Sequence, residues 1–365
     1  MVRWLSSAFN FNGWVMTNTE IISNLSFPKL TSVYGFKSIA HLFGSSKPRC
    51  GIYLLAFPGE KYYIGQATDI VRRFSQHFKT YERIDGFTFL KSPRSKLDAL
   101  EKDLIYQAEK AGLTLLNVIH VSNVVGETDL DVLFDVGVLE RWIKDPSEEN
   151  LNDLGTIPIT LPLAHNQRAS LKFVQLQAQP LFTTALTQLF AFLDTAIPYP
   201  RTSEFSFWAV SAMPGTNRNT LPRMLCVNVS MMEVFSVGYY LEEDCADLTW
   251  SFINVASDVF YEGFGSLKEF ELEHPDISVN TSPSYRDGGQ LLIKLDAFTQ
   301  NCMINLLLDQ RVTKAAATLC LRLMRKRPTI FSKFHCPQLV DAALSYRELS
   351  DDELAEKIEA TCIQD

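Results

Sequence analysis

The feature that most constrains the fold is a β-hairpin pattern followed directly by an amphipathic helix pattern. Residues 51–56 (GIYLLA) form a β-rich run, residues 58–61 (PGEK) are typical of a turn, and residues 62–65 (YYIG) resume the strand. Thr68 or Asp69 can cap the helix that follows. Apolar residues recur there at helical spacing: Ile70, Val71, Phe74 and Phe78. Antiparallel strands mixed with helices predict the α+β class.

The length of 365 residues fits two domains, and the pattern of expected helices and strands in the second half differs from that in the first. Residues 87–90 favour a short strand, and residues 96–111 favour an amphipathic helix that ends before Gly112. An acidic, proline-containing segment, DPSEEN at 145–150, indicates the start of a linker. We therefore expect an N-terminal arm over 1–47, a first domain over 48–145, a linker region over 146–170 and a second domain over 171–365.

The second half predicts a larger α+β domain without internal repeats. One helix is expected over 171–196, and two more over 298–309 and 312–327. Strand-like runs are expected at 205–210, 224–229, 234–237 and 290–295.

Composition places the chain among ordinary globular proteins, with 46% hydrophobic and 21% charged residues. The longest apolar runs are shorter than the roughly 18 residues that span a bilayer, and polar residues interrupt the first 16 positions. We expect no membrane contact and a cytoplasmic location. The seven cysteines lack CxxC spacing, which favours reduced core thiols, and His335-Cys336 favours a helix start ahead of Pro337 rather than a zinc site.

The net charge of −8 hides an asymmetry between the two parts of the chain. Residues 1–120 carry 15 Lys and Arg against 9 Asp and Glu, a balance of +6, whereas residues 121–365 carry −14. A polyanion such as nucleic acid is therefore expected at the first part.

An ordered set of polar residues accompanies the hairpin. The tripeptides GIY (51–53) and YIG (63–65) are followed by Arg73 and by His77, four positions later on the same helix face. Glu101 lies in the apolar stripe of the next predicted helix, where a carboxylate is unfavourable. Each residue alone is most simply a surface or core residue, but the joint order is specific.

With Asn117 added, this set resembles the GIY-YIG nuclease family over about residues 50–120. The resemblance implies a small three-stranded antiparallel sheet with flanking helices, and DNA cleavage with one Mg²⁺ or Mn²⁺ per active site. It implies catalytic roles for five residues: Tyr53, Tyr63, Arg73, His77 and Glu101. Glu101 would be the metal ligand and Asn117 matches the downstream asparagine. Gln66 departs from the pattern, because some relatives carry a lysine there.

Elementary chemistry agrees with those roles. An arginine fork suits a phosphate, and a carboxylate-held Mg²⁺ suits the leaving oxygen. A tyrosine is a poor base at its usual pKa near 10, so it needs a neighbouring cation or hydrogen bond. The sequence leaves open whether Tyr53 or Tyr63 is the base, with Tyr53 slightly favoured, and His77 could relay the proton.

The expected partner is DNA, and further residues are predicted to contact it. These residues are Lys61, Arg72, Lys79, Lys91, Arg94, Lys96, Asn117 and, in the loop 214–220, Arg218. By analogy, a lone nuclease module beside an unfamiliar domain fits restriction, phage defence or a mobile element. The second domain would select the target or partner, or pair two chains in a homodimer. The alternative is a non-catalytic nucleic-acid-binding protein that recruits a partner through its acidic domain.

Overall fold

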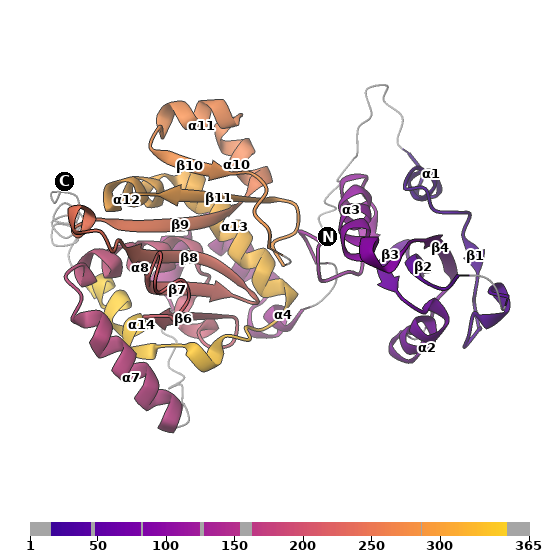
Figure 1. The fold of residues 1–365 in the computed structure, drawn as a ribbon, viewed down its shortest axis with the longest axis horizontal. Coiled ribbons are helices and arrows are strands. Elements are labelled where there is room, and N and C mark those ends of the chain that lie inside the picture. Colours follow the sequence, from indigo (N-terminus) through magenta and orange to yellow (C-terminus); the bar gives the residue numbers. More distant parts are fainter. Residues whose placement is uncertain are drawn as a thin grey trace. The chain divides into compact units, whose positions relative to one another are not determined.

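The computed structural model shows a chain of two compact units, Met1–Gly126 (unit 1) and Glu127–Asp365 (unit 2). Within the described residues there are two β-sheets, of five and six strands, and fourteen α-helices (Figure 1). The α+β class is therefore confirmed. The structure describes residues 16–44, 48–81, 83–124, 128–153, 163–285 and 287–348.

The sheet of unit 1 has the strand order β1-β4-β2-β3-β5. Its strands are β1 (Thr31–Ser32), β2 (Gly51–Phe57), β3 (Lys61–Ala67), β4 (Gly86–Lys91) and β5 (Thr114–Leu115). The three long strands β4, β2 and β3 are antiparallel, β1 pairs antiparallel with β4, and β5 pairs parallel with β3. The two edge strands make this sheet larger than the three strands expected, because a two-residue strand is too short to leave a period-2 pattern.

Helices of unit 1 cover both faces of that sheet. They are α1 (Asn18–Asn24), α2 (Ile70–Thr80) and α3 (Leu97–Lys110), with the 3₁₀ turns η1 (Ala40–Leu42) and η2 (Arg94–Lys96). Alternation along β2 sends Ile52 and Leu54 into the core under α3, and Tyr53 and Leu55 into the core under α2. Asp69 caps α2 by accepting hydrogen bonds from the amides of Val71 and Arg72.

The segment before β2 is part of unit 1 rather than a separate arm. Ile21 and Ile22 of α1 are buried in the core under α3, whereas Val33 and Ile39 are buried in the core under α2. Residues 16–44 thus contribute to both cores.

Unit 2 is built on an antiparallel sheet with the order β10-β11-β9-β8-β7-β6. Its strands are β6 (Trp208–Ala212), β7 (Arg223–Val229), β8 (Met232–Tyr239), β9 (Thr249–Ala256), β10 (Ile277–Asn280) and β11 (Leu292–Ala297). Helices α8 and α13 pack on one face, where the Phe192 ring stacks on Phe235 with centroids 4.6 Å apart (Figure 1). The sequence pattern did not single out β9 or β10.

The helices of unit 2 differ in number from the expectation. They are α4 (Asp129–Leu133), α5 (Val136–Trp142), α6 (Pro146–Leu151), α7 (Leu163–Gln177), α8 (Phe182–Ala196), α9 (Pro200–Ser203), α10 (Ser257–Phe264), α11 (Leu267–Glu273), α12 (Gln300–Leu308), α13 (Gln310–Lys326) and α14 (Pro337–Leu344), with the 3₁₀ turns η3 (Glu243–Cys245), η4 (Ser332–Phe334) and η5 (Ser345–Glu348). The single helix expected over 171–196 is two helices, since Pro180 lies between them and cannot continue a helix.

The boundary between the units lies near residue 126, not at 145. Trp142 is fully buried in the core of unit 2, and its indole donates to Asn150 Oδ1 at 2.9 Å. Asn150 in turn donates to the carbonyls of Asp194 and Ile197. The expected linker over 146–170 instead contains α6 and the start of α7, because Asp145 and Pro146 cap and begin a helix.

The six cysteines in the described ranges are free, and Cys362 lies outside those ranges. Cys336 is the N-cap of α14, so the expected helix start at Pro337 is confirmed. Among the helices that the structure describes, none combines the length and the apolar character needed to cross a membrane.

Candidate active site

The hairpin places the two motif tyrosines side by side. Tyr53 lies directly opposite Gly65 across β2 and β3, and its ring stacks with that of Tyr63 with centroids 6.1 Å apart. A Cβ at position 65 would lie 2.6 Å from Tyr53 Oη and 2.7 Å from the Tyr63 ring. Glycine leaves room here for the Tyr53 phenol, which any larger residue would force to move. Tyr53 is fully buried, whereas Tyr63 is half-buried.

Helix α2 brings Arg73 and His77 to the Tyr53 hydroxyl. His77 Nε2 lies 2.6 Å from Tyr53 Oη, and Arg73 Nε donates to the same oxygen at 3.3 Å. The ring of His77 also packs against Tyr63, with centroids 5.0 Å apart, and is stacked on Tyr81. The structure thus brings together four of the residues named from the sequence: Tyr53, Tyr63, Arg73 and His77.

Burial and the charge of Arg73 set the protonation of this group. Burial raises the pKa of Tyr53 and of Tyr63, although Arg73 opposes the shift at both phenols. Burial and, to a lesser extent, Arg73 lower the pKa of His77 to about 4. At neutral pH both phenols carry their protons and His77 is neutral. A Tyr53 hydroxyl that donates to Nε2 and accepts from Arg73 satisfies both contacts.

Helix α3 supplies two carboxylates, and Gln66 links them. Gln66 Nε2 donates to Glu101 Oε2 at 2.9 Å and to Asp98 Oδ1 at 2.5 Å. Gln66 follows Gly65 on β3, so this amide ties Asp98 and Glu101 of α3 to the strand that carries Tyr63. The negative charge of Glu101 raises the pKa of both Tyr53 and Tyr63, so it acts on the same group.

Asp98 is the site residue that sequence reasoning missed. It precedes Glu101 by three positions, which places both carboxylates on one face of a helix. That spacing is the signal by which it could have been found. Gln66, first noted only as a departure from the family pattern, is the residue that joins Asp98 to the site.

The donor set at α3 fits Mg²⁺ or Mn²⁺. Carboxylate oxygens are the ligands that these cations favour, and Mg²⁺ commonly uses only one or two of them and keeps several waters. Asp98 is exposed and Glu101 is half-buried, so water and phosphate oxygens can reach them. The amide that spans them is neutral, so this contact does not cancel their charge.

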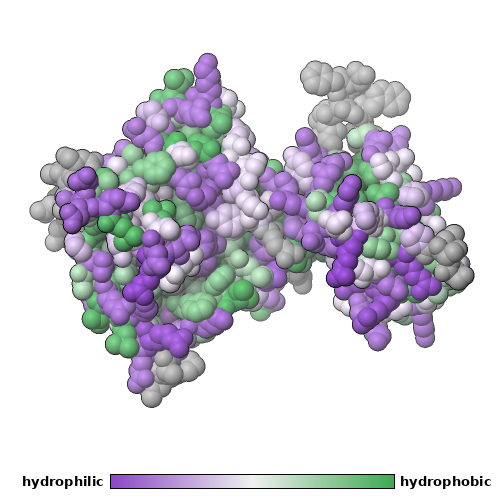
Figure 2. Space-filling view, in the orientation of Figure 1, coloured by the Kyte–Doolittle hydropathy of each residue, from purple (hydrophilic) through white to green (hydrophobic). Residues whose placement is uncertain are grey.

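The predicted phosphate contacts of unit 1 are exposed side chains on several elements. Lys61 begins β3, Lys91 ends β4, and Arg72 and Lys79 lie on α2. Arg94 and Lys96 are exposed on η2, immediately before the helix that carries Glu101. Hydrophilic side chains predominate over α2 on the face drawn in Figure 2. Arg218 is exposed between β6 and β7 in unit 2.

Asn117 has a different role from the one predicted. It is 4% exposed, its Oδ1 accepts from the Ile64 amide at 3.0 Å, and its Nδ2 donates to the Ile64 carbonyl at 2.6 Å. Both polar atoms of the side chain therefore bind the backbone of β3 and hold the segment that follows β5 against that strand. This geometry does not support a contact with nucleic acid, and it makes Asn117 a residue that positions the YIG strand.

A second group of possible metal ligands lies in unit 2, at Glu273, His274 and Asp309. The Arg311 guanidinium donates to Glu273 at 2.6 Å and to Asp309 at 2.7 Å. Arg311 already pairs with both carboxylates, so we interpret the group as an ion-pair network.

Comparison of the chain with models of protein families, with curated proteins and with solved structures finds no match.

Proposed function

We propose that unit 1 is a divalent-metal-dependent endonuclease that hydrolyses phosphodiester bonds in DNA. The observation that supports it is the meeting of two phenols, a neutral imidazole and an arginine. The charge of Glu101, one of the two carboxylates that Gln66 links on α3, acts on both phenols. These groups come from β2, β3, α2 and α3, and the family resemblance assigns each motif residue a role in this chemistry. The basic balance of residues 1–120 favours a polyanionic substrate.

Hydrolysis requires a new bond from water oxygen to phosphorus and cleavage of the bond to the 3′ oxygen. Arg73 is exposed and presents its guanidinium to the phosphoryl oxygens, on which charge grows. A cation held by Glu101 and Asp98 would stabilise the charge on the departing oxygen.

Tyr63 is the better candidate for the base. Tyr53 is fully buried and its oxygen is bound by His77 and Arg73. Tyr63 is half-buried, and its hydrogen bonds to Arg73 and Tyr53 favour the phenolate. Arg73 is the strongest influence that lowers the pKa of Tyr63, against the larger effect of burial. In this proposal the Tyr63 phenolate takes the proton of the attacking water, and Tyr53 and His77 hold Tyr63 and Arg73 in place.

The test is cleavage of supercoiled plasmid and of phage genomic DNA in Mg²⁺, Mn²⁺ or EDTA. The variant Glu101→Ala is compared with Asp103→Ala, an exposed carboxylate on the same helix whose partner is Gln107. We expect nicks or discrete fragments that disappear in EDTA and in Glu101→Ala, with DNA affinity retained, and unchanged cleavage by Asp103→Ala.

The same assay separates the alternative. An intact wild-type protein that binds DNA but yields no metal-dependent product on either substrate would favour the non-catalytic nucleic-acid-binding protein. The role proposed for unit 2, selection of a DNA target or of a partner, is tested by mapping the ends of the fragments. Fragments with a common end sequence would support target selection, and random ends would count against it.

A further inference from the structure

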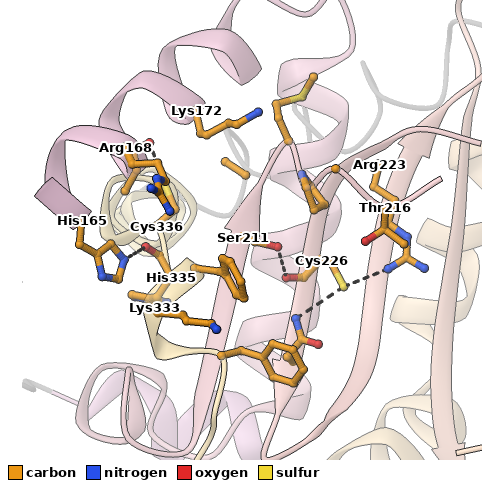
Figure 3. Close-up of a pocket in the computed structure, with 18 of the residues that line it drawn as sticks. His165, Arg168, Lys172, Ser211, Thr216, Arg223, Cys226, Lys333, His335 and Cys336 are labelled. Atoms are coloured by element: carbon orange, nitrogen blue, oxygen red, sulfur yellow. Dashed lines mark hydrogen bonds between the residues drawn. The ribbon is translucent and has the colours of Figure 1, made fainter. Parts of the chain in front are cut away.

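Unit 2 contains a cavity of about 510 Å³ that the proposed nuclease chemistry does not use. It lies between α7, the strands β6 to β8 and residues 331–336 (Figure 3). Arg168 and Lys172 come from α7 and Lys333 comes from η4, while Ser211, Cys226 and Arg223 lie on the strands opposite them.

Three cations of the cavity have no carboxylate partner among the described residues. Arg168 and Lys172 are four residues apart on α7 and therefore neighbours on its surface, and Lys333 lies on the adjoining wall. No ion pair joins any of these three to a carboxylate in the ranges that the structure describes. Like charges gathered around one cavity repel, so a bound anion would relieve an unfavourable interaction.

Two further charged residues of the lining, Glu233 and Arg223, also favour an anionic ligand. Among the described residues that line the cavity, Glu233 is the only carboxylate, and Arg223 Nη1 already binds it at 2.6 Å. Arg223 is 9% exposed, and its Nε is buried without a hydrogen-bond partner among the described residues. An unsatisfied donor on a buried cation is costly, which makes it a ready contact for an acceptor oxygen.

The cavity also offers apolar and aromatic surface. Its lining includes Phe331, Phe334, Met213 and Pro214. Phe334 is 50% exposed, and the Lys333 ammonium lies 4.9 Å from the centre of its ring. A ligand that fills this space would combine a flat apolar group, which packs on the phenylalanines, with phosphate oxygens for the cations.

We propose that this cavity binds a nucleotide, with its base on the Phe331 and Phe334 side and its phosphates at Arg168, Lys172 and Lys333. A cavity of 510 Å³ has the size usual for small ligands. An extended DNA backbone is disfavoured here, because residues 121–365 carry a balance of −14 and would repel it outside the cavity.

Two residues of the lining that could react, Cys226 and His335, are not free to do so. Burial raises the pKa of the Cys226 thiol to about 12, so it is not a thiolate nucleophile at neutral pH. Both ring nitrogens of His335 have partners, Val210 N and Glu204 Oε1. Neither residue offers a free group for attack or proton transfer.

The experiment is isothermal titration calorimetry of the full chain with ADP, GDP, CDP and UDP. EDTA and the Glu101→Ala background remove any contribution of phosphates bound through a metal in unit 1. The nucleoside of the nucleotide that binds and inorganic phosphate serve as the two halves of the ligand. We expect saturable binding of at least one nucleotide, and at least tenfold weaker binding of each half alone.

Two double variants, each of which removes two positive charges, test where the nucleotide binds. Arg168→Ala with Lys172→Ala removes two cavity cations, and Lys268→Ala with Lys314→Ala removes two exposed cations of α11 and α13 outside it. We expect the first pair to weaken nucleotide binding at least tenfold and the second to leave it unchanged. All four positions are at the surface or half-buried, and thermal unfolding checks that both proteins fold.

Three results would overturn the proposal. They are no saturable binding by any of the four nucleotides, inorganic phosphate binding as tight as the nucleotide, and equal nucleotide affinity in both double variants. None depends on cleavage, so failure here and failure of the proposed nuclease are separate outcomes.

Discussion

Each unit holds a buried histidine beside a sheet, and the two are used differently. His335 in unit 2 is fully buried, accepts from the Val210 amide at 3.2 Å and lies 2.8 Å from Glu204 Oε1, so both ring nitrogens are occupied by fixed partners. His77 in unit 1 is 8% exposed and binds a phenol that also contacts an arginine at the surface. A histidine bonded to a backbone amide and a buried carboxylate stabilises the fold, whereas one bonded to a titratable side chain beside an open arginine can serve chemistry.

The largest expected effect on stability is in unit 2. His335→Ala leaves the Val210 amide and the buried Glu204 without this partner, and we expect a loss of about 3–5 kcal/mol in the free energy of unfolding. His77→Ala removes the bond to a neutral phenol and the ring packing on Tyr63 and Tyr81, but it leaves no buried charge unpaired. It should therefore lose less than half as much. Urea unfolding of both variants measures the difference. Equal losses would contradict the division between a structural and a chemical histidine.

The largest expected effect on activity is in unit 1. Tyr63→Phe removes the proposed base and should slow plasmid cleavage by roughly 10²- to 10⁴-fold, the range usual for loss of a general base. Tyr62→Phe is the matched control, because Tyr62 is the preceding residue but belongs to the core under α3. The rate of the wild type should rise with pH above neutrality, since burial raises the pKa of Tyr63. A flat rate above pH 7 would argue against a tyrosine base.

The local elements of this site were predictable, and the contacts between them were not. The expected hairpin over 51–65 matches β2 and β3, and the helices before and after β4 match because their apolar spacing is local. The bridge from Gln66 to Asp98 spans 32 residues and depends on how α3 packs on the sheet. Likewise, Asn117 follows an apolar pair in the sequence, and nothing there shows that its amide binds the backbone of Ile64.

In unit 2 the sequence was less informative, because some buried strands lack the hydrophobic pattern by which a strand is recognised. Strand β9 (TWSFINVA) is buried along its whole length although it carries Thr, Ser and Asn, so it has neither an exposed polar face nor the continuous apolar run seen in β7. The DPSEEN segment has the composition of a linker, but the same residues cap and begin α6. Tertiary burial of Asn150 decides between the two interpretations, and it is invisible in the sequence.

The free energy of unfolding should fall in acid, because the pKa of His77 is lower than that of an ordinary histidine. Its pKa is lowered to about 4 in the folded protein against 6.5 for the ordinary side chain, so the unfolded chain binds more protons between these values. The stabilisation is therefore present above pH 6.5 and is lost as the pH falls toward 4, by roughly 1–3 kcal/mol. Urea unfolding between pH 7 and pH 4 should show a steeper loss for wild type than for His77→Gln. If the stability of the two proteins falls equally with pH, the pKa of His77 is not lowered in the folded protein.

Two glycines of the hairpin are constrained for different reasons, Gly65 by neighbouring atoms and Gly59 by its backbone conformation. An Ala at Gly65 collides with the Tyr53 phenol, whereas Gly59 has φ of +72° and open space around its Cβ position. We expect each substitution to destabilise the protein by about 1–3 kcal/mol, from overpacking at the first and from a left-handed backbone at the second. Only Gly65→Ala should also lower cleavage, by at least tenfold, because it displaces Tyr53 from His77. Equal cleavage by both variants would show that the Tyr53 position is not critical.

The smallest expected effect tests whether the surface of unit 1 contacts phosphate. Arg72→Ala removes an exposed cation adjacent in sequence to Arg73 but outside the hydrogen-bonded group. DNA affinity should fall a few-fold, by less than about 1 kcal/mol, and the slope of log affinity against log salt should decrease by about 1. Lys268→Ala, an exposed cation on α11 of unit 2, should leave both quantities unchanged. If the two variants shift the salt slope equally, the contact is a general effect of net charge. A loss confined to Arg72→Ala would place the DNA backbone along α2, next to the arginine that faces the scissile phosphate in the proposed reaction.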